Sequence, residues 1–357
     1  MNENHNPWGN SDRPPGPGSP RPWEDGSYRF GGAVPPQPPP MAPDQNLRRL
    51  LRRNANCVCL ALALVYASIP VFSIIIGLLN HLIPGFTELL FGLSPVWMGV
   101  LNMSVFALAL LLPTWIILRF LNIPLHVAFP MRRTPASITV PGVFCTLGTS
   151  VVGVFIAAML VAFMTAATGA TPTMPDFSPP DYGTAETVIF LISISVFPAI
   201  FEELLFRGVV MQSLRRFGDP FALIVSSILF AMLHRNFIQG PNALLTGLVL
   251  GYFTLRAGSL IPAIVAHFVN NLFAGSLSVI VVRLPERYAE ILSISIFPFY
   301  LALGAVGLII LSLNGGFVPL RQHLTGLFER QKYLLFFTSP LALLFILATI
   351  WETRQFM

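Results

Sequence analysis

Four side chains that can exchange protons or donate hydrogen bonds lie inside long apolar segments of this sequence: Glu202, His234, His267 and Asn271. Polar and ionisable groups within membrane-spanning segments are costly, and by default they indicate a functional site. Glu202 has no basic residue three or four positions away, so no local cation neutralises it on its own helix. The residue types therefore predict acid–base chemistry, with Glu202 as the candidate base.

The next residue, Glu203, has a different prediction, because Arg207 follows it at the i+4 position. Side chains four apart share one face of a helix, and the acid-first order is the favourable one. We expect a buried ion pair that supports the fold beside Glu202. Pro198 lies four residues before Glu202 and should kink this helix next to the carboxylates.

The four candidate residues are expected to meet at one depth. At a rise of 1.5 Å per residue, Glu202, His234, His267 and Asn271 lie between roughly 12 and 21 Å from the cytoplasmic ends of their predicted helices. The three helices alternate in direction, yet their polar groups reach a common layer. Independent structural polar groups would not need to agree in depth, so a single site is predicted.

Two mechanisms fit such a site, and both hydrolyse a carbonyl compound. A carboxylate beside an imidazole can deprotonate water, while a second imidazole and an amide donate to the developing oxyanion. Alternatively, Glu202, His234 and His267 could hold one divalent metal with a position open for water, which is the ligand set of a catalytic zinc site. The metal-binding motif HExxH and the nucleophile motif GxSxG are both absent from the chain.

The composition places these residues in a membrane protein. The chain has 357 residues, of which 54% are hydrophobic and 10% charged, whereas a soluble domain carries about 25% charge. We predict an all-α polytopic membrane protein with about nine transmembrane helices, in a membrane domain over residues 47–357 that contacts lipid. The helices are expected in the charge-free runs 54–87, 89–118, 134–175, 187–201, 220–234, 236–255, 257–282, 291–320 and 333–351.

Residues 1–46 differ from the rest of the chain, because they contain 12 Pro and 6 Gly with little aliphatic content. This composition predicts a disordered, Pro-rich cytoplasmic tail. The net charge of +5 comes from basic residues at the ends of apolar runs, which indicates membrane topology rather than a nucleic-acid partner. No CxxC pair occurs among the three cysteines, so no disulfide partner is expected.

The distribution of basic residues predicts a cytoplasmic N-terminus and a C-terminus outside. The loops near 81–95 and 169–186 contain no Lys or Arg, and we expect them on the outer side. The expected cytoplasmic groups are Arg48–Arg53, Arg132 with Arg133, Arg215 with Arg216, Arg256, and the segment 321–332.

The spacing of these residues resembles a known family. Three motifs occur in order, namely Glu202-Glu203-x-x-x-Arg207, Phe230-x-x-x-His234 and His267-x-x-x-Asn271. Together they look like the CAAX-protease and bacteriocin-processing (CPBP, or Abi) family of intramembrane endopeptidases. The resemblance covers roughly residues 185–275, which we take as the catalytic core. Within that family, this sequence is similar to the type II CAAX prenyl endopeptidases, which cut after a prenylated cysteine.

The resemblance implies a role for each motif residue. Glu202 would activate water with assistance from His234, and His267 with Asn271 would stabilise the oxyanion. Glu203 and Arg207 would complete the first motif. The family is described both as metal-dependent and as glutamate-type, so the cofactor stays open between none and one divalent metal.

We therefore expect an intramembrane endopeptidase whose substrate is membrane-bound, lipidated or bacteriocin-like. Two other functions stay open. A catalytically silent scaffold or immunity protein would keep the same fold and act by binding. A transporter would use the polar layer as an ion site, but it would favour inverted repeats with paired broken helices, and we see none in the sequence.

Overall fold

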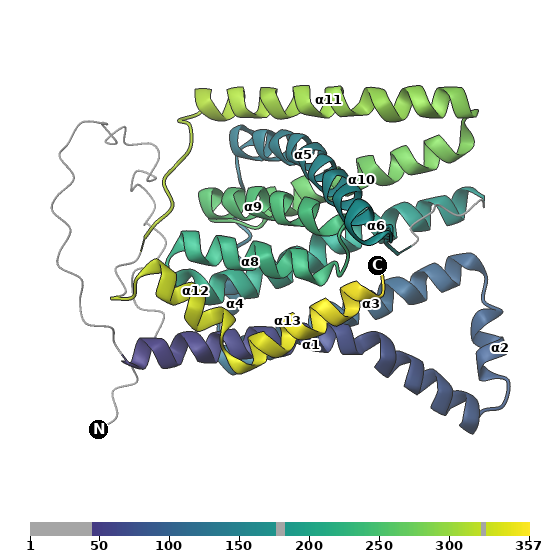
Figure 1. The fold of residues 1–357 in the computed structure, drawn as a ribbon, viewed down its shortest axis with the longest axis horizontal. Coiled ribbons are helices and arrows are strands. Elements are labelled where there is room, and N and C mark those ends of the chain that lie inside the picture. The colour runs from purple at the N-terminus through teal and green to yellow at the C-terminus, as the bar shows by residue number, and fades with distance from the viewer. Residues whose placement is uncertain (1–44, 176–182, 323–325) are drawn as a thin grey trace. The chain divides into compact units, whose positions relative to one another are not determined.

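The computed structural model describes residues 45–175, 183–322 and 326–357, and all regular structure in these ranges is helical (Figure 1). The all-α prediction is therefore confirmed for the described residues. The predicted disordered tail lies outside them, except for its last two residues, which begin the first helix. The cysteines at 57, 59 and 145 are free thiols.

Ten helices build most of the bundle, and short elements join them. The ten are α1 (Gln45–Leu82), α3 (Pro95–Leu121), α5 (Ala136–Thr168), α6 (Thr184–Glu203), α8 (Asp219–Leu233), α9 (Gln239–Ala257), α10 (Ile261–Arg283), α11 (Glu286–Leu313), α12 (Glu329–Phe337) and α13 (Pro340–Arg354). The short elements are α2 (Phe86–Phe91), α4 (Leu125–Ala128), a π-helix (Leu204–Val210), α7 (Met211–Leu214) and a 3₁₀ turn (Arg215–Phe217).

The structure does not confirm nine transmembrane helices. Each of the nine charge-free runs contains a helix, but only six helical segments within the described ranges are long and apolar enough to cross a membrane. The pair α12 and α13, bent by 69°, brings the number to seven if it counts as one span. Neither α8 nor α9 is among these segments.

Helix α8 is too short to cross on its own, and it forms a hairpin with α9. The 15 residues of α8 rise roughly 22 Å at 1.5 Å each, which is less than the ≈ 30 Å hydrocarbon core of a bilayer. The hairpin ends well short of the right-hand ends of α6, α10 and α11 in Figure 1. Non-helical backbone at such depth is tolerated where it is buried in protein or lines a cavity.

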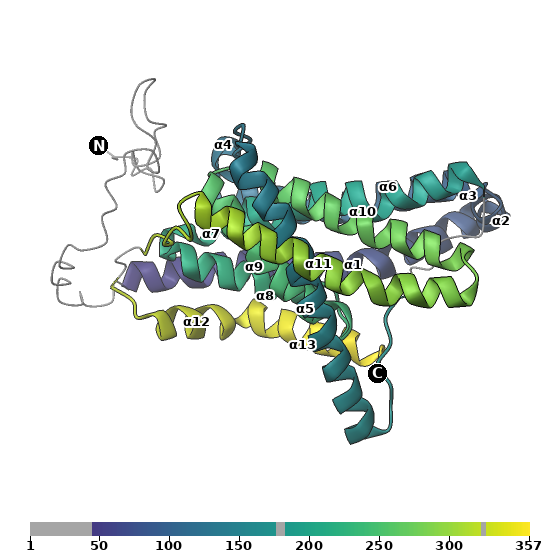
Figure 2. The same cartoon turned by 90° about the horizontal axis from the view of Figure 1, so that it is seen from above.

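The hairpin is held by longer helices on several sides. Helix α9 packs against α5 and α8, α5 packs against α11, and α10 packs against α6 (Figures 1 and 2). The α5–α11 contact depends on two glycines, because a Cβ on Gly148 would lie 2.6 Å from the Cα of Gly304. Helix α1 packs against α3 and α13, and α3 in turn packs against α6.

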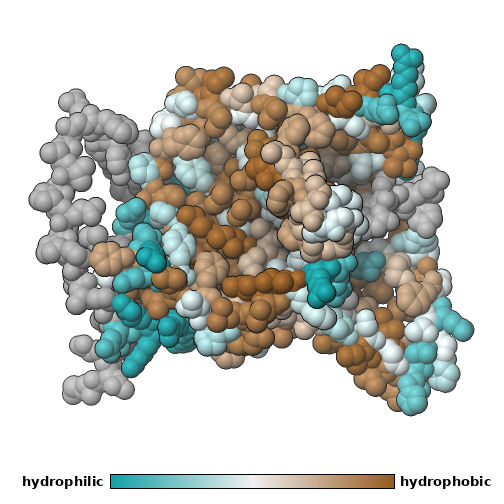
Figure 3. Space-filling model, viewed as in Figure 1, coloured by the Kyte–Doolittle hydropathy of each residue, from teal (hydrophilic) through white to brown (hydrophobic). Residues whose placement is uncertain are grey.

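Basic loops gather at one end of the bundle. The backbone N–H of Leu260 donates to the carbonyl of Pro130 at 2.8 Å, and that of Asp219 donates to Arg321 at 2.9 Å. Four loops that are far apart in sequence therefore meet in two pairs. Figure 3 shows hydrophobic side chains over much of the visible face, with hydrophilic ones at the lower left, the upper and lower right, and in one patch right of centre. The surface is that of an integral membrane protein.

Candidate active site

The two neighbouring carboxylates lie at the junction between α6 and the π-helix. Glu203 is the last residue of α6, and the wider turns of the π-helix begin at Leu204. Side chains from outside the segment satisfy two of its carbonyls: Gln212 Nε2 donates to Arg207 O at 3.2 Å, and Ser226 Oγ donates to Phe206 O at 3.0 Å. Such π-helical segments are frequent at functional sites.

Glu203 is the centre of a closed polar cluster, here called the Glu203 cluster, with Arg207 and His267. Its Oε1 accepts from Arg207 Nη1 at 2.8 Å and is 2.8 Å from His267 Nδ1. Glu203 is 0% exposed and Arg207 1%. The predicted ion pair is therefore confirmed, but its contact with His267 was not predicted. Glu203 Oε2 is buried without a hydrogen-bond partner.

Arg207 is enclosed by two groups from the α8–α9 hairpin. Its Nη2 donates to the carbonyl of Gly247 at 3.1 Å, and its guanidinium carbon lies 4.4 Å from the centre of the Phe230 ring. A Cβ at Gly247 would lie 3.3 Å from Nη2, so a side chain there would crowd the guanidinium. The arginine is thus bound on three sides, by a carboxylate, a carbonyl and a ring face.

The contacts of His267 assign its tautomer. Glu203 Oε1 accepts from Arg207, and in this ion pair it also accepts from the Nδ1–H of His267. The other ring nitrogen, Nε2, lies 3.8 Å from Glu202 Oε2. His267 therefore connects the two carboxylates, with one nitrogen engaged and the other directed at Glu202.

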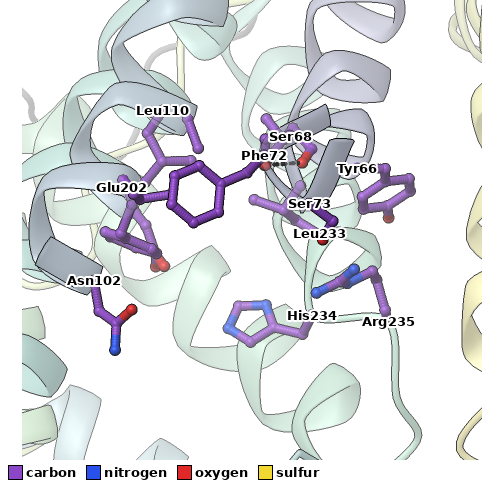
Figure 4. Close-up of a pocket in the computed structure, with 14 residues that line it drawn as sticks. Tyr66, Ser68, Phe72, Ser73, Asn102, Leu110, Glu202, Leu233, His234 and Arg235 are labelled. Atoms are coloured by element: carbon purple, nitrogen blue, oxygen red, sulfur yellow. Dashed lines mark hydrogen bonds between the residues drawn. The ribbon is translucent and has the colours of Figure 1, made fainter. Parts of the chain in front are cut away.

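Glu202 lines a cavity of about 390 Å³, here called the Glu202 cavity, together with His234 and Arg235 (Figure 4). Its walls are mostly apolar and come from helices outside the three motifs. Helix α1 contributes Val65, Tyr66, Ser68, Phe72 and Ser73, and α3 contributes Asn102, Val105, Phe106, Ala109 and Leu110. In Figure 4 the Phe72 ring extends from α1 towards Glu202.

His234 is oriented by the last turn of α8. Its Nδ1 lies 2.9 Å from the carbonyl of Phe230, which can only accept, so Nδ1 donates and Nε2 is the nitrogen without the proton in the neutral ring. The Phe230 ring stands edge-on to both imidazoles, with centroids 5.0 Å from His234 and 6.0 Å from His267. One aromatic ring thus separates the two histidines.

Asn271 is not among the residues that line the Glu202 cavity. Its Nδ2 donates to the carbonyl of Ile194 on α6 at 3.1 Å, and its Oδ1 accepts from Asn270 at 3.3 Å. The amide therefore joins α10 to α6. Nδ2 carries a second hydrogen that this contact does not use.

The possible metal ligands have suitable chemistry but do not form a metal centre here. Both imidazoles have Nδ1 engaged and Nε2 available, which is how metal-binding histidines are usually held. Among the described residues, however, no three His, Cys, Asp or Glu side chains are grouped so that they could hold a metal ion. Glu202, His234 and His267 would have to move closer together to bind one.

The comparison with protein families concerns this part of the chain. Residues 184–273 match the family model described as type II CAAX prenyl endopeptidase, Rce1-like. The match confirms the family recognised from the three motifs, and it supports a CAAX-type protease role for this membrane protein. It includes every predicted site residue, from Glu202 to Asn271. No curated protein and no solved structure matches the chain.

The Rce1-like region does not contain the whole cavity, because α1 and α3 precede it. Sequence reasoning missed these walls. The available signals were weak: Asn102 is a lone amide in an apolar run, and Tyr66 is a lone phenol. Arg235 was noticeable as a charge directly after His234, and the structure places it in the cavity wall.

Proposed function

We propose that this protein is an intramembrane endopeptidase that hydrolyses a peptide bond in a membrane-associated substrate, with prenylated CAAX-type proteins as the first class to test. The observation that carries the proposal is that Glu202 and His234, from different helices, line one cavity with largely apolar walls. A membrane-embedded cavity of this kind suits a substrate that is lipidated or apolar at its cleavage site.

Glu202 is the proposed base. Its carboxylate takes a proton from water, the resulting hydroxide attacks the carbonyl carbon, and a tetrahedral intermediate forms. The carbon–nitrogen bond then breaks, and Glu202 returns the proton to the leaving amine. His234 assists, because its Nε2 can accept a hydrogen bond from the same water while Phe230 fixes the ring.

His267 and Asn271 are the proposed oxyanion donors. A proton on His267 Nε2 would make the ring cationic, and the carboxylates of Glu202 and Glu203 lie on its two sides to stabilise that charge. Asn271 offers the second hydrogen of Nδ2, although its first is used on Ile194. We propose that this chemistry runs without a metal, because a carboxylate and an imidazole suffice to activate the water.

The decisive experiment compares Glu202→Gln with wild type on a prenylated CAAX peptide in lipid nanodiscs, with product release followed by mass spectrometry. Removal of the base should lower kcat by at least about 10³-fold, the scale typical of a lost catalytic group. Glu186→Gln is the matched control, because Glu186 is in the first turn of the same helix. Equal rates for wild type and Glu202→Gln would rule out the proposed base. Wild-type protein that cleaves no peptide, yet binds it, would favour a silent scaffold.

We also propose that the N-terminus is cytoplasmic and the C-terminus outside. The support is the clustering of the loops at 130–132 and 258–260, and of those at 217–219 and 321, at one end of the bundle, since basic loops stay on the cytoplasmic side. Single cysteines at 133 and 173, on a background without the three native cysteines, should react from the inside and the outside respectively. Labelling of both from one side would contradict this topology.

A further inference from the structure

Arg235 lies in the wall of the Glu202 cavity, but the proposed hydrolysis does not use it. It follows His234 directly and has φ of 59°, a left-handed conformation that is uncommon outside glycine. Asn236 stabilises this turn: its Oδ1 accepts from the backbone N–H of Ile238 and Gln239, and its Nδ2 donates to His234 O. The turn therefore fixes Arg235 and His234 together.

The guanidinium of Arg235 is held loosely compared with that of Arg207. Its one side-chain hydrogen bond among the described residues is to Glu352 Oε2 at 3.2 Å, and it lies 5.6 Å from the Tyr66 ring centre. A guanidinium has five N–H donors in a planar fork that matches a carboxylate. The side chains of Arg235 and Glu352 are 24% and 27% exposed. Most of the N–H donors of Arg235 therefore have no acceptor among the described residues.

Its position makes Arg235 selective for an anion. It is the only Lys or Arg among the described residues that line the cavity, and in Figure 4 its guanidinium lies beside the His234 ring. The α8–α9 turn does not reach across a bilayer, and an unpaired cation at that depth is costly. The group currently paired with it is a carboxylate, contributed by α13.

We propose that Arg235 binds a carboxylate of the substrate, taking over the contact that Glu352 makes in the free protein, and so selects substrates with a carboxylate within a few residues of the cleaved bond. This inference rests on the proposed function. The carboxylate can be the free C-terminus of the substrate or the side chain of an Asp or Glu. Since Arg235 adjoins His234, binding there would also position the peptide bond against the proposed base.

The first test measures binding alone. Three prenylated peptides of one sequence are compared on Glu202→Gln protein in nanodiscs by fluorescence anisotropy: a C-terminal acid, its carboxamide, and a carboxamide with one added Asp. We expect the acid, the Asp peptide or both to bind at least about tenfold more tightly than the plain carboxamide, as for a charge-assisted hydrogen bond. The peptide that gains affinity identifies the source of the carboxylate. Equal binding of all three would overturn the proposal.

Variants then assign the preference to Arg235. In the Glu202→Gln protein, the further change Arg235→Gln should reduce the ratio of the affinities for the acid and the carboxamide to about one. Arg235→Lys should keep part of this preference. Glu352→Gln should raise affinity for the acid, because the competing carboxylate is gone. Arg354→Gln is the matched control, since it removes an exposed charge from the same helix. The proposal would be overturned if Arg235→Gln kept the whole preference for the acid over the carboxamide, or if Glu352→Gln bound the acid more weakly.

A cleavage assay separates this inference from the proposed function. With wild-type enzyme, the preference should appear in KM for the acid over the amide, and Arg235→Gln should remove it. If wild type cleaves none of the peptides, the proposed endopeptidase activity fails. The binding ratio on the Glu202→Gln protein then still decides whether Arg235 recognises a carboxylate.

Discussion

Glu202 and Glu203 are neighbours in sequence, yet they belong to two very different regions. Glu203 is completely buried and shares one oxygen between Arg207 and His267. Glu202 lines an open cavity, and its Oε2 lies 3.8 Å from His267 Nε2. Adjacent positions on a helix point about 100° apart, so one turn supplies both regions. Charges in the closed cluster stabilise the fold, whereas charges facing the cavity remain available to a substrate.

The largest expected effect concerns the closed cluster. Arg207→Ala would leave Glu203 as a buried carboxylate without its cation, which costs about 3–5 kcal/mol. Thermal and denaturant unfolding in detergent should show this loss. Arg215→Ala is the comparison: Arg215 pairs with Asp219 at the same spacing, but Arg215 is 36% and Asp219 5% exposed, so water can partly replace the guanidinium and the loss should be smaller. An Arg207→Ala protein that is stable but inactive would assign Arg207 to the catalytic machinery instead.

Asn271 tests where the boundary between the two regions lies. As an oxyanion donor it should lower kcat by about 10²–10³-fold when changed to Ala, with little change in KM. Ser278→Ala is the control on the same helix, because its hydroxyl donates to the carbonyl of Gly275 and not to Asn271. Should Asn271→Ala reduce stability but leave kcat intact, the amide would belong with the structural contacts, through its bond to Ile194.

A smaller effect is expected at the π-helix. Ser226→Ala removes the hydroxyl that donates to the carbonyl of Phe206 and should cost about 1 kcal/mol of unfolding free energy. Ser227→Ala is the comparison, because that hydroxyl bonds only within its own helix, to Leu223. Equal stability of the two variants would mean that the π-helix does not need this external partner.

The smallest expected effect is that of metal removal. If the proposed mechanism is right, prolonged chelation should leave the activity of purified protein within twofold of the untreated sample, since no step uses a metal. Loss of activity that zinc restores would show that Glu202, His234 and His267 rearrange around an ion, and the open cavity would then be an unfilled metal site.

Local spacing predicted side-chain contacts better than it predicted the number of membrane-spanning helices. The Glu203–Arg207 pair follows from helix periodicity alone. The depth estimate placed Glu202, His234, His267 and Asn271 in one layer; in the structure His267 lies 3.8 Å from Glu202 and His234 lines the same cavity as Glu202, whereas Asn271 does not line it. The contact between His267 and Glu203 could not be predicted, because it depends on how α10 rotates against α6. The cavity walls were missed for a similar reason: α1 and α3 are apolar on most faces, so their sequences do not indicate which face meets the site. The α8–α9 hairpin could not be predicted from the charge pattern, because a run without charged residues need not form a helix that crosses the bilayer.

The pairing of Arg235 with Glu352 also has a consequence for biosynthesis. The two residues are 117 positions apart, and at 5–20 residues per second the ribosome needs on the order of ten seconds to cover that distance. Throughout that interval the newly made hairpin carries a cation whose partner has not yet been translated. The Glu202 cavity can therefore reach its final electrostatic state only after residue 352 has been translated, and a product truncated before that residue would retain the three motifs with an uncompensated charge among them.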